Sequence, residues 1–147
     1  MGISSRELFA RLIKCEAGGE GENGMKGVAT VVMNRVNVTG GQYLREGQGD
    51  LRKVIMEPYE FTCAADTVYG EPNPQTVWSN SPEEIHYQIA DWALSGNKLS
   101  GVDESLWYYN PFAPDCAQYF PRNGSGYLYN RINAHCFYYP AAKYYTT

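Results

Sequence analysis

Glu16 is the side chain of this sequence that is best placed for acid–base chemistry. Apolar residues recur before it at helical spacing, namely Leu8, Phe9, Leu12 and Ile13. At about 100° per residue, Glu16 falls near the centre of that same apolar stripe. A carboxyl group held against apolar neighbours has its charged form disfavoured, so its pKa rises. Such a group can stay protonated near neutral pH and act as a general acid.

The residues after Glu16 leave open space beside it. Three glycines follow, Gly18, Gly19 and Gly21, and they predict the end of the helix. The structural alternative is that Glu16 bends out to solvent or caps a nearby turn, as most acids at helix ends do. Glu20 and Glu22 lie beyond the first glycines, and we interpret them as solvated acids near the start of the next helix.

Aromatic residues with polar tips form the second chemical signal. Nine of the 13 tyrosines lie between Tyr108 and Tyr145. Three segments pair aromatic rings with hydrogen-bonding side chains: residues 59–63, 107–111 and 132–138. A cleft that binds a polymer needs this mixture of stacking faces and placed polar groups. The same runs are also compatible with strands that fill a core.

Length and charge limit the classes of function. The chain has 147 residues with 44% hydrophobic and 19% charged residues, which predicts one globular domain. A net charge of -4 without a basic run argues against nucleic acid as a partner. No apolar stretch has the length of a membrane span, and no secretory signal is visible. An uncharged or mixed polymer such as a glycan fits this balance.

The elements that must position these residues are mainly helical. Helices are predicted from Ser4 to about Ala17, where Ser4 and Glu7 form a capping box, and over residues 23–36. A short helix should follow Asp50, and another should run from Ser81 to Gly96. Gly27 should let another backbone approach its helix closely. Further on, strands or extended segments are expected at residues 106–109 and 136–139, with a turn at 122–126. The predicted fold is therefore a helical body with an aromatic-rich flank of loops and short strands.

The cysteines and histidines leave two alternative chemistries open. Cys15, Cys63, Cys116 and Cys136 form no C-x-x-C pair, so they can make up to two disulfides or remain buried thiols. Without a visible leader, reduced thiols are slightly favoured. Cys15 or Cys63 with His135 could act as a cysteine hydrolase, although Cys15 points away from Glu16 on the helical wheel. A zinc site at His135 and Cys136 is disfavoured because adjacent residues rarely bind one tetrahedral ion. We expect no metal and no cofactor, and we interpret His86 as a surface or satisfied core histidine.

Several runs, taken in order, resemble one enzyme family. They are residues 15–20 (CEAGGE), residues 27–36 (GVATVVMNRV), the Phe61-Thr62 pair, residues 109–111 (YNP) and residues 133–138 (NAHCFY). Together they resemble the spore cortex-lytic cell-wall hydrolases of the CwlJ/SleB type and span nearly the whole chain. The apparent lack of a leader and of a wall-binding domain resembles the stand-alone branch more than the secreted one.

This resemblance implies an α+β, mainly α, lysozyme-like fold and a single catalytic domain over residues 1–147. It also implies cleavage of spore cortex peptidoglycan during germination, at the spore coat or cortex surface, with spore-coat proteins as possible partners. The family's acid maps onto Glu16. Candidate substrate-binding residues are Phe61, Thr62, Tyr108, Tyr109, Asn110, His135 and Tyr138. Two positions depart from the family pattern: Gly18 replaces a larger residue, and Glu60 stands where Gln is expected.

The number of acids favours one mechanism. Glycosidases that hydrolyse usually need two carboxylates at set separations, and only Glu16 is a strong candidate for a catalytic carboxylate here. A single acid suffices for a lytic transglycosylase acting between N-acetylmuramic acid and N-acetylglucosamine. The alternatives are a hydrolytic muramidase or glucosaminidase that uses Glu60 or Asp66 as second carboxylate, and a non-catalytic glycan-binding protein of the spore coat.

Overall fold

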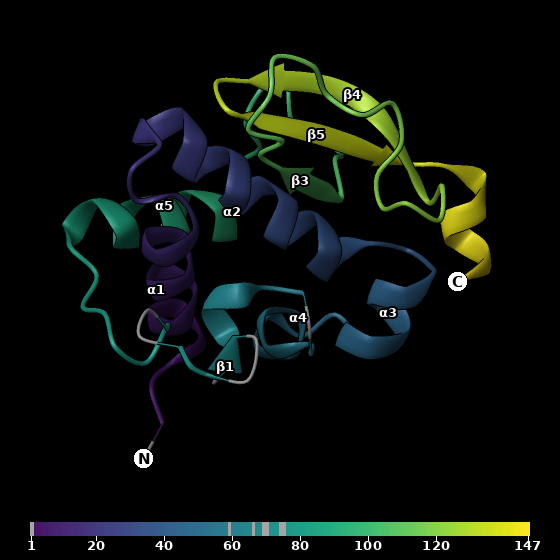
Figure 1. Cartoon of the computed structure of the whole chain (residues 1–147). Helices are drawn as coiled ribbons and strands as arrows, with labels where there is room; N and C mark the ends of the chain where they lie inside the picture. The colour runs from purple at the N-terminus through teal and green to yellow at the C-terminus, as the bar shows by residue number, and fades with distance from the viewer. Residues whose placement is uncertain (1, 59, 66, 69–70, 74–75) are drawn as a thin grey trace.

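Two long helices, α1 (Ser5–Ala17) and α2 (Gly21–Asn37), form the centre of the protein (Figure 1). The structure, a computed structural model, describes residues 2–58, 60–65, 67–68, 71–73 and 76–147. Three further helices pack around the central pair: α3 (Gln42–Gly47), α4 (Leu51–Met56) and α5 (Glu84–Leu94). Among the described residues, no helix is long and apolar enough to cross a membrane.

Local capping explains where two of the helices begin. The Ser4 hydroxyl accepts a hydrogen bond from Glu7 N at 3.0 Å, and the Asp50 carboxylate accepts one from Lys53 N at 3.0 Å. Both bonds satisfy amide groups that have no partner within the helix, as the sequence predicted.

The predicted start of α5 at Ser81 was wrong. The helix begins at Glu84 because Glu83 is its N-cap and exchanges bonds with His86, whose Nδ1 accepts from Glu83 N at 2.9 Å. His86 is buried and satisfied, which confirms the interpretation of this residue. Helix α3 was not predicted, because six residues are too few to show a helical period.

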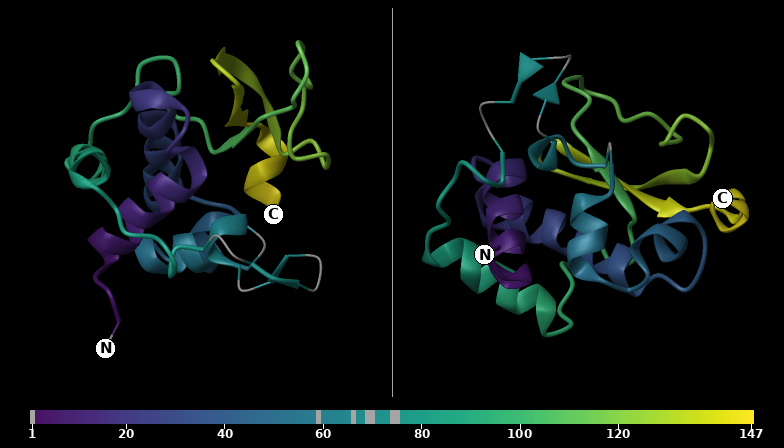
Figure 2. Two further views of the ribbon diagram at one scale, coloured as in Figure 1. Left: turned by 60° about the vertical axis from the view of Figure 1, so that its left-hand side comes forward. Right: turned by 90° about the horizontal axis from the view of Figure 1, so that it is seen from below.

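A three-stranded antiparallel sheet covers one side of α2 (Figures 1 and 2). Its strands are β3 (Trp107–Tyr109), β4 (Gly126–Ile132) and β5 (His135–Pro140), with β5 in the middle. The strands expected at 106–109 and 136–139 are confirmed as β3 and β5. The edge strand β4 was missed, since its alternation is interrupted by a register shift between Leu128 and Asn130.

The remaining elements are short. Two antiparallel strands of two residues each, β1 (Thr67–Val68) and β2 (Glu71–Pro72), follow the 3-10 turn η1 (Thr62–Ala64). The chain ends in a second 3-10 helix, η2 (Ala142–Thr146). η1 lies against α1 and η2 follows directly from β5, so both turns flank the space between the helical body and the sheet.

Three groups of buried side chains hold these layers together. The largest fills the space between the helices and includes Leu8, Phe9, Leu12, Ile13, Val28, Val32, Ile55 and Ile89. An aromatic group lies under the sheet and contains Tyr43, Leu106, Trp107, Cys136, Tyr138 and Tyr144. A third group, Val31, Val102 and Phe137, joins α2 to the sheet.

Gly27 is the point of closest approach between α2 and the sheet. A Cβ atom at this position would lie 2.9 Å from Cζ of the buried Phe137 ring. The expectation that a backbone approaches here was therefore wrong, because an aromatic ring occupies the space. The missing side chain lets the central strand β5 pack directly on the helix.

All four cysteines are paired, which corrects the expectation of reduced thiols. Cys15 is bonded to Cys63, and Cys116 to Cys136. Each pair joins segments that are distant in sequence, with separations of 48 and 20 residues, so no local spacing could reveal it. Neither Cys15 nor Cys63 carries the free thiol that a cysteine hydrolase requires.

We predict that Gly126→Ala destabilises the protein by about 1–3 kcal/mol, the usual cost of forcing an extra carbon into a packed core. The added Cβ would clash with the Phe120 carbonyl and lie 2.7 Å from the Trp107 ring. The measurement is the free energy of unfolding in urea. Gly19→Ala is the control, because nothing lies within 4 Å of a Cβ there. Equal unfolding midpoints for the two variants would contradict the packing described here.

Candidate active site

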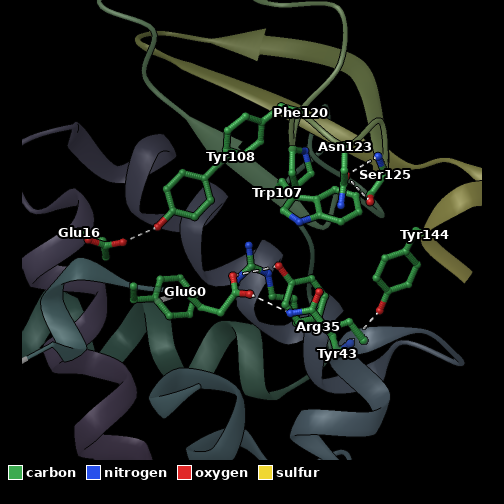
Figure 3. A pocket seen from close by; sticks show the side chains of 13 residues that line it. Glu16, Arg35, Tyr43, Glu60, Trp107, Tyr108, Phe120, Asn123, Ser125 and Tyr144 are labelled. Atoms are coloured by element: carbon green, nitrogen blue, oxygen red, sulfur yellow. Dashed lines mark hydrogen bonds and ion pairs between the residues drawn. The ribbon is translucent and has the colours of Figure 1, made fainter. Parts of the chain in front are cut away.

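A cavity of about 330 Å3 opens between the helical body and the sheet (Figure 3). Helices α1, α2 and α3 and the segment before η1 form one wall, while β3, residues 120–125 and η2 form the other. The lining residues are Glu16, Arg35, Gln42, Tyr43, Glu60, Phe61, Trp107, Tyr108, Phe120, Pro121, Asn123, Ser125 and Tyr144. Aromatic rings and polar groups thus share one space, as in most ligand sites.

Glu16 lies in the last turn of α1 with its carboxyl group in this cavity. Its Oε1 accepts a hydrogen bond of 2.9 Å from the Tyr108 hydroxyl, and the two side chains point toward one another (Figure 3). On the other side, Cys63 Sγ lies 3.0 Å from Oε2. This sulfur belongs to a disulfide and has no hydrogen to donate, so Oε2 gains no hydrogen bond there in exchange for lost water.

The environment of Glu16 favours its protonated form. Burial raises the pKa of Glu16 above its ordinary value, and this effect outweighs the Tyr108 hydrogen bond and the Arg35 charge, which both lower it. Burial also raises the pKa of the Tyr108 phenol, so that phenol remains a hydrogen-bond donor. The site therefore holds a carboxyl group that can keep a proton where an ordinary glutamate has lost it, as a general acid requires.

Arg35 provides the positive charge among the residues that line the cavity. Its side chain is only 4% exposed, and its Nε donates to Leu106 O at 2.7 Å. The guanidinium lies over the rings of Tyr43 and Phe61, 4.4 and 5.1 Å from their centroids. Its Nη1 is 3.5 Å from Oε2 of Glu60. A buried cation is tolerated when it is paired in this way.

Glu60 is a second carboxylate in the same cavity, but its oxygens are already bonded. Oε2 accepts from the Tyr43 hydroxyl at 3.0 Å, and Oε1 accepts from Gln42 Nε2 at 3.2 Å. The same Gln42 amide donates to Glu57 at 3.1 Å, whose pKa is raised chiefly by burial. Glu60 thus accepts hydrogen bonds at both oxygens, whereas Glu16 accepts one, from Tyr108.

Three of the predicted substrate-binding residues lie at or behind the cavity. Phe61 and Tyr108 line it. His135 is buried and packs edge-on against the Tyr108 ring at a centroid distance of 5.3 Å. Burial lowers the pKa of His135, so the ring is largely neutral at neutral pH. His135 supports Tyr108 from behind and does not line the cavity itself.

The other four predicted residues lie outside the cavity lining. Thr62 is exposed in η1, and the Asn110 side chain closes a turn by accepting from Phe112 N at 2.8 Å. Tyr138 is fully buried and donates to Ala117 O at 2.7 Å. Tyr109 stacks on Phe120 with centroids 4.5 Å apart, so it positions a ring that does line the cavity. Asp66, the other candidate second carboxylate, lies outside the described residues.

Most of the remaining lining residues were not singled out from the sequence. Gln42, Tyr43, Phe120, Asn123, Ser125 and Tyr144 come from segments that carried no recognisable motif. Arg35 could have been found, because it is a charged residue inside the apolar run 27–36 that carries the family resemblance. A charge in such a run is expected to have a buried partner.

Fold and site together define an α+β, mainly α-helical enzyme in which one desolvated acid stands between a helical body and a small antiparallel sheet. The chain belongs to the cell wall hydrolase family, whose profile matches residues 19–138. It is therefore a peptidoglycan-degrading enzyme. Glu16 lies just before the matched residues, so its assignment depends on its position in the structure.

Curated relatives and solved structures agree with this membership. The cell wall hydrolase CwlJ of Bacillus subtilis is 26% identical over 93% of this chain and 86% of its own length. CwlJ of Halalkalibacterium halodurans is 29% identical over 92% of this chain and 85% of its own length. The catalytic domain of the germination-specific lytic transglycosylase SleB from Bacillus anthracis matches with a TM-score of 0.62 at 26% identity, covering 93% of this chain and 97% of that domain. The SleB catalytic domain from Bacillus cereus matches with a TM-score of 0.65 at 25% identity, covering 93% of this chain and 92% of that domain.

We predict that Tyr108→Phe raises the pKa of Glu16 further. The substitution removes the hydrogen bond that favours the charged carboxylate and keeps the ring that packs on His135. Because the pKa rises, the acid form of Glu16 should persist to higher pH than in the wild type. The measurement is a carbon-13 NMR titration of the Glu16 carboxyl. Tyr109→Phe is the matched control, since that hydroxyl accepts from Ala117 N and does not touch Glu16. An unchanged or lower pKa in Tyr108→Phe would contradict this account.

Proposed function

We propose that this protein is a lytic transglycosylase that cleaves the glycan strands of spore cortex peptidoglycan between N-acetylmuramic acid and N-acetylglucosamine. The observation that carries the proposal is the contrast between the two carboxyl groups of the cavity. Glu16 is desolvated and able to hold a proton, whereas both oxygens of Glu60 are engaged by neighbouring donors. One acid suits transglycosylation, and hydrolysis usually requires two.

The chemistry needs Glu16 twice. Protonated Glu16 donates its proton to the glycosidic oxygen, the bond from that oxygen to C1 of the muramic acid breaks, and positive charge develops at C1. The Glu16 carboxylate then takes the proton from the 6-hydroxyl of the same sugar while that oxygen bonds to C1. The product is a 1,6-anhydro sugar, Glu16 is protonated again, and no water is consumed.

The neighbours of Glu16 suit both steps. Before proton transfer, burial keeps the carboxyl group protonated. After transfer, the Tyr108 hydroxyl stabilises the carboxylate through its 2.9 Å hydrogen bond. The half-buried ring of Phe120 in the opposite wall supplies an apolar face for a sugar ring. The name of the B. anthracis structure, a germination-specific lytic transglycosylase, supports the same reaction for this chain.

Hydrolysis is the second candidate, because Glu60 lines the same cavity as Glu16. As a general base, Glu60 would have to bind and deprotonate a water molecule. Its bonds to Tyr43 and Gln42 and its pairing with Arg35 already occupy the carboxylate. Both oxygens of Glu60 are thus held by neighbouring donors, whereas one oxygen of Glu16 is, so we favour the single-acid mechanism.

The proposal includes a setting for the reaction. Residues 1–147 act as one catalytic domain at the spore coat or cortex surface during germination, where spore-coat proteins are possible partners. The likeness to CwlJ from two bacilli and to a germination-specific SleB domain supports this setting.

We predict that Glu16→Gln lowers the rate of cortex peptidoglycan cleavage by at least about 100-fold, the usual contribution of a general acid. The amide keeps the size of the side chain but has no acidic proton. The measurement is digestion of purified cortex peptidoglycan followed by mass analysis of the soluble fragments. Wild-type protein should release 1,6-anhydromuramic ends.

Glu60→Gln is the matched control, because it changes the other carboxyl group of the cavity in the same way. The folded Glu60→Gln protein should retain anhydro products, and circular dichroism checks the fold because the substitution removes the charge that pairs with Arg35. Wild-type products that carry only reducing N-acetylmuramic acid ends would overturn the transglycosylase mechanism. Loss of those hydrolytic products in Glu60→Gln would identify Glu60 as the second carboxylate.

A further inference from the structure

A second cavity of about 380 Å3 lies on the other side of the junction between the helices and the sheet. Its lining residues are Asn34, Asn37, Val38, Thr39, Lys98, Glu104, Leu106, Tyr139, Pro140 and Tyr145. None of them lines the cavity that contains Glu16. Three pairs of sequence neighbours are divided between the two cavities: Asn34 and Arg35, Leu106 and Trp107, and Tyr145 and Tyr144. The same framework therefore presents one hollow on each side.

Asn34 is a buried polar residue in the wall of this cavity. The side chain is 5% exposed, and its Nδ2 donates to Asp103 O at 2.7 Å and to Ser105 O at 2.8 Å. These bonds fix the orientation of the amide. Its Oδ1 is buried and has no hydrogen-bond partner among the described residues. A buried acceptor without a partner is costly, and the two donated bonds of the same amide hold it in this place.

Tyrosine rings supply stacking faces along the same side. Tyr145 is 51% exposed, and Tyr139 is held in place by a hydrogen bond of 3.1 Å that its hydroxyl accepts from Glu104 N. Tyr139 also stacks on Tyr129, with ring centroids 4.1 Å apart, and Tyr129 donates to the Asp103 carboxylate. The Tyr139 ring is therefore fixed before a ligand arrives, which limits the entropy lost on binding.

The charge around this cavity suits an uncharged ligand. Its charged lining residues are Lys98 and Glu104, and these two form an ion pair with each other. The other polar groups are the amide of Asn37 and the hydroxyl groups of Thr39 and the tyrosines. Amides and hydroxyls beside aromatic faces match the hydroxyls and apolar faces of a sugar ring. The volume lies within the range of small-molecule sites.

We propose that this cavity, with Tyr139 and Tyr145 as stacking faces, is a non-catalytic binding site for a neutral N-acetylated sugar of a glycan strand. The proposal rests on the proposed function in taking a glycan as the ligand. It adds a site outside the catalytic cavity that holds the enzyme on its polymer. Binding at two places on one polymer raises the effective concentration of glycan at the cleft, without a new contact in the cleft itself.

The first test measures binding of catalytically inactive protein, so that the polymer is not digested. The full-length Glu16→Gln variant is compared with the same protein carrying Tyr145→Ala or, separately, Asn37→Arg, which fills the cavity from the exposed end of α2. Co-sedimentation with insoluble peptidoglycan should show binding about 3- to 10-fold weaker for each added substitution, because Tyr145→Ala removes an aromatic face and Asn37→Arg blocks the cavity. Trp78→Ala is the control, because Trp78 is 46% exposed and lines neither cavity.

The second test locates the ligand with tetra-N-acetylchitotetraose and nitrogen-15 NMR. Amide signals of Asn37, Thr39 and Lys98 should shift on titration, and Tyr145→Ala should weaken those shifts while leaving shifts around Glu16 unchanged. Shifts confined to the catalytic cavity, or peptidoglycan binding unaffected by both substitutions, would overturn the proposal. Binding of a protein partner, and not of the sugar, at the second cavity would also overturn the proposal.

Activity assays separate this proposal from the proposed function. In the active protein, Tyr145→Ala should slow digestion of insoluble peptidoglycan at low polymer concentration and leave turnover of short soluble fragments unchanged. Equal loss on both substrates would place Tyr145 in the catalytic site and overturn the proposal. Sugar-induced shifts at Asn37 without any cleavage by the wild type would reject the proposed function and retain the second site.

Discussion

The attachment of α2 to the strand segment beside it is the constraint on which the rest of the structure depends. Asn34 and Arg35, adjacent in α2, donate three side-chain hydrogen bonds to the carbonyl groups of Asp103, Ser105 and Leu106. The Arg35 charge is buried, so breaking its pairing would leave an uncompensated ion, a loss of about 3–5 kcal/mol. These three hydrogen bonds hold the segment before β3 against the helical body, and residues on either side of them line the two cavities.

The two carboxyl groups of the catalytic cavity show how environment assigns different roles to the same side chain. Glu16 is surrounded by a disulfide and a phenol, so burial dominates and its pKa rises. Glu60 accepts bonds from Tyr43 and Gln42 beside the Arg35 guanidinium. At Glu16, desolvation by burial outweighs the hydrogen bond from Tyr108 and the charge of Arg35, so the acid form is favoured. Separation of the two environments within one small cavity is what the proposed single-acid mechanism requires.

Helical periodicity and capping residues correctly predicted features that depend on near neighbours in the sequence. The helical stripe located Glu16, and the capping residues Ser4 and Asp50 located two helix starts, because these signals involve neighbours within one or two turns. The disulfides, the strand β4 and the Arg35 pairing depend on contacts between distant segments, which periodicity does not encode. The resemblance supplied the family, yet it did not separate Phe61 and Tyr108, which line the cavity, from Tyr138, which is core.

The tyrosines of the last forty residues explain why composition alone could not assign their function. Tyr138 and Tyr144 are buried in the aromatic group under the sheet, while Tyr139 and Tyr145, the next residue in each case, face the second cavity. Tyr144 also lines the cavity that contains Glu16, and its hydroxyl accepts a hydrogen bond of 3.0 Å from Tyr43 N. Neighbouring tyrosines therefore do different work because successive side chains point to different sides of the chain. A rigid ring with a polar tip suits a core, a cleft wall and an exposed sugar-binding face alike, so one residue type can serve all three along a single short segment.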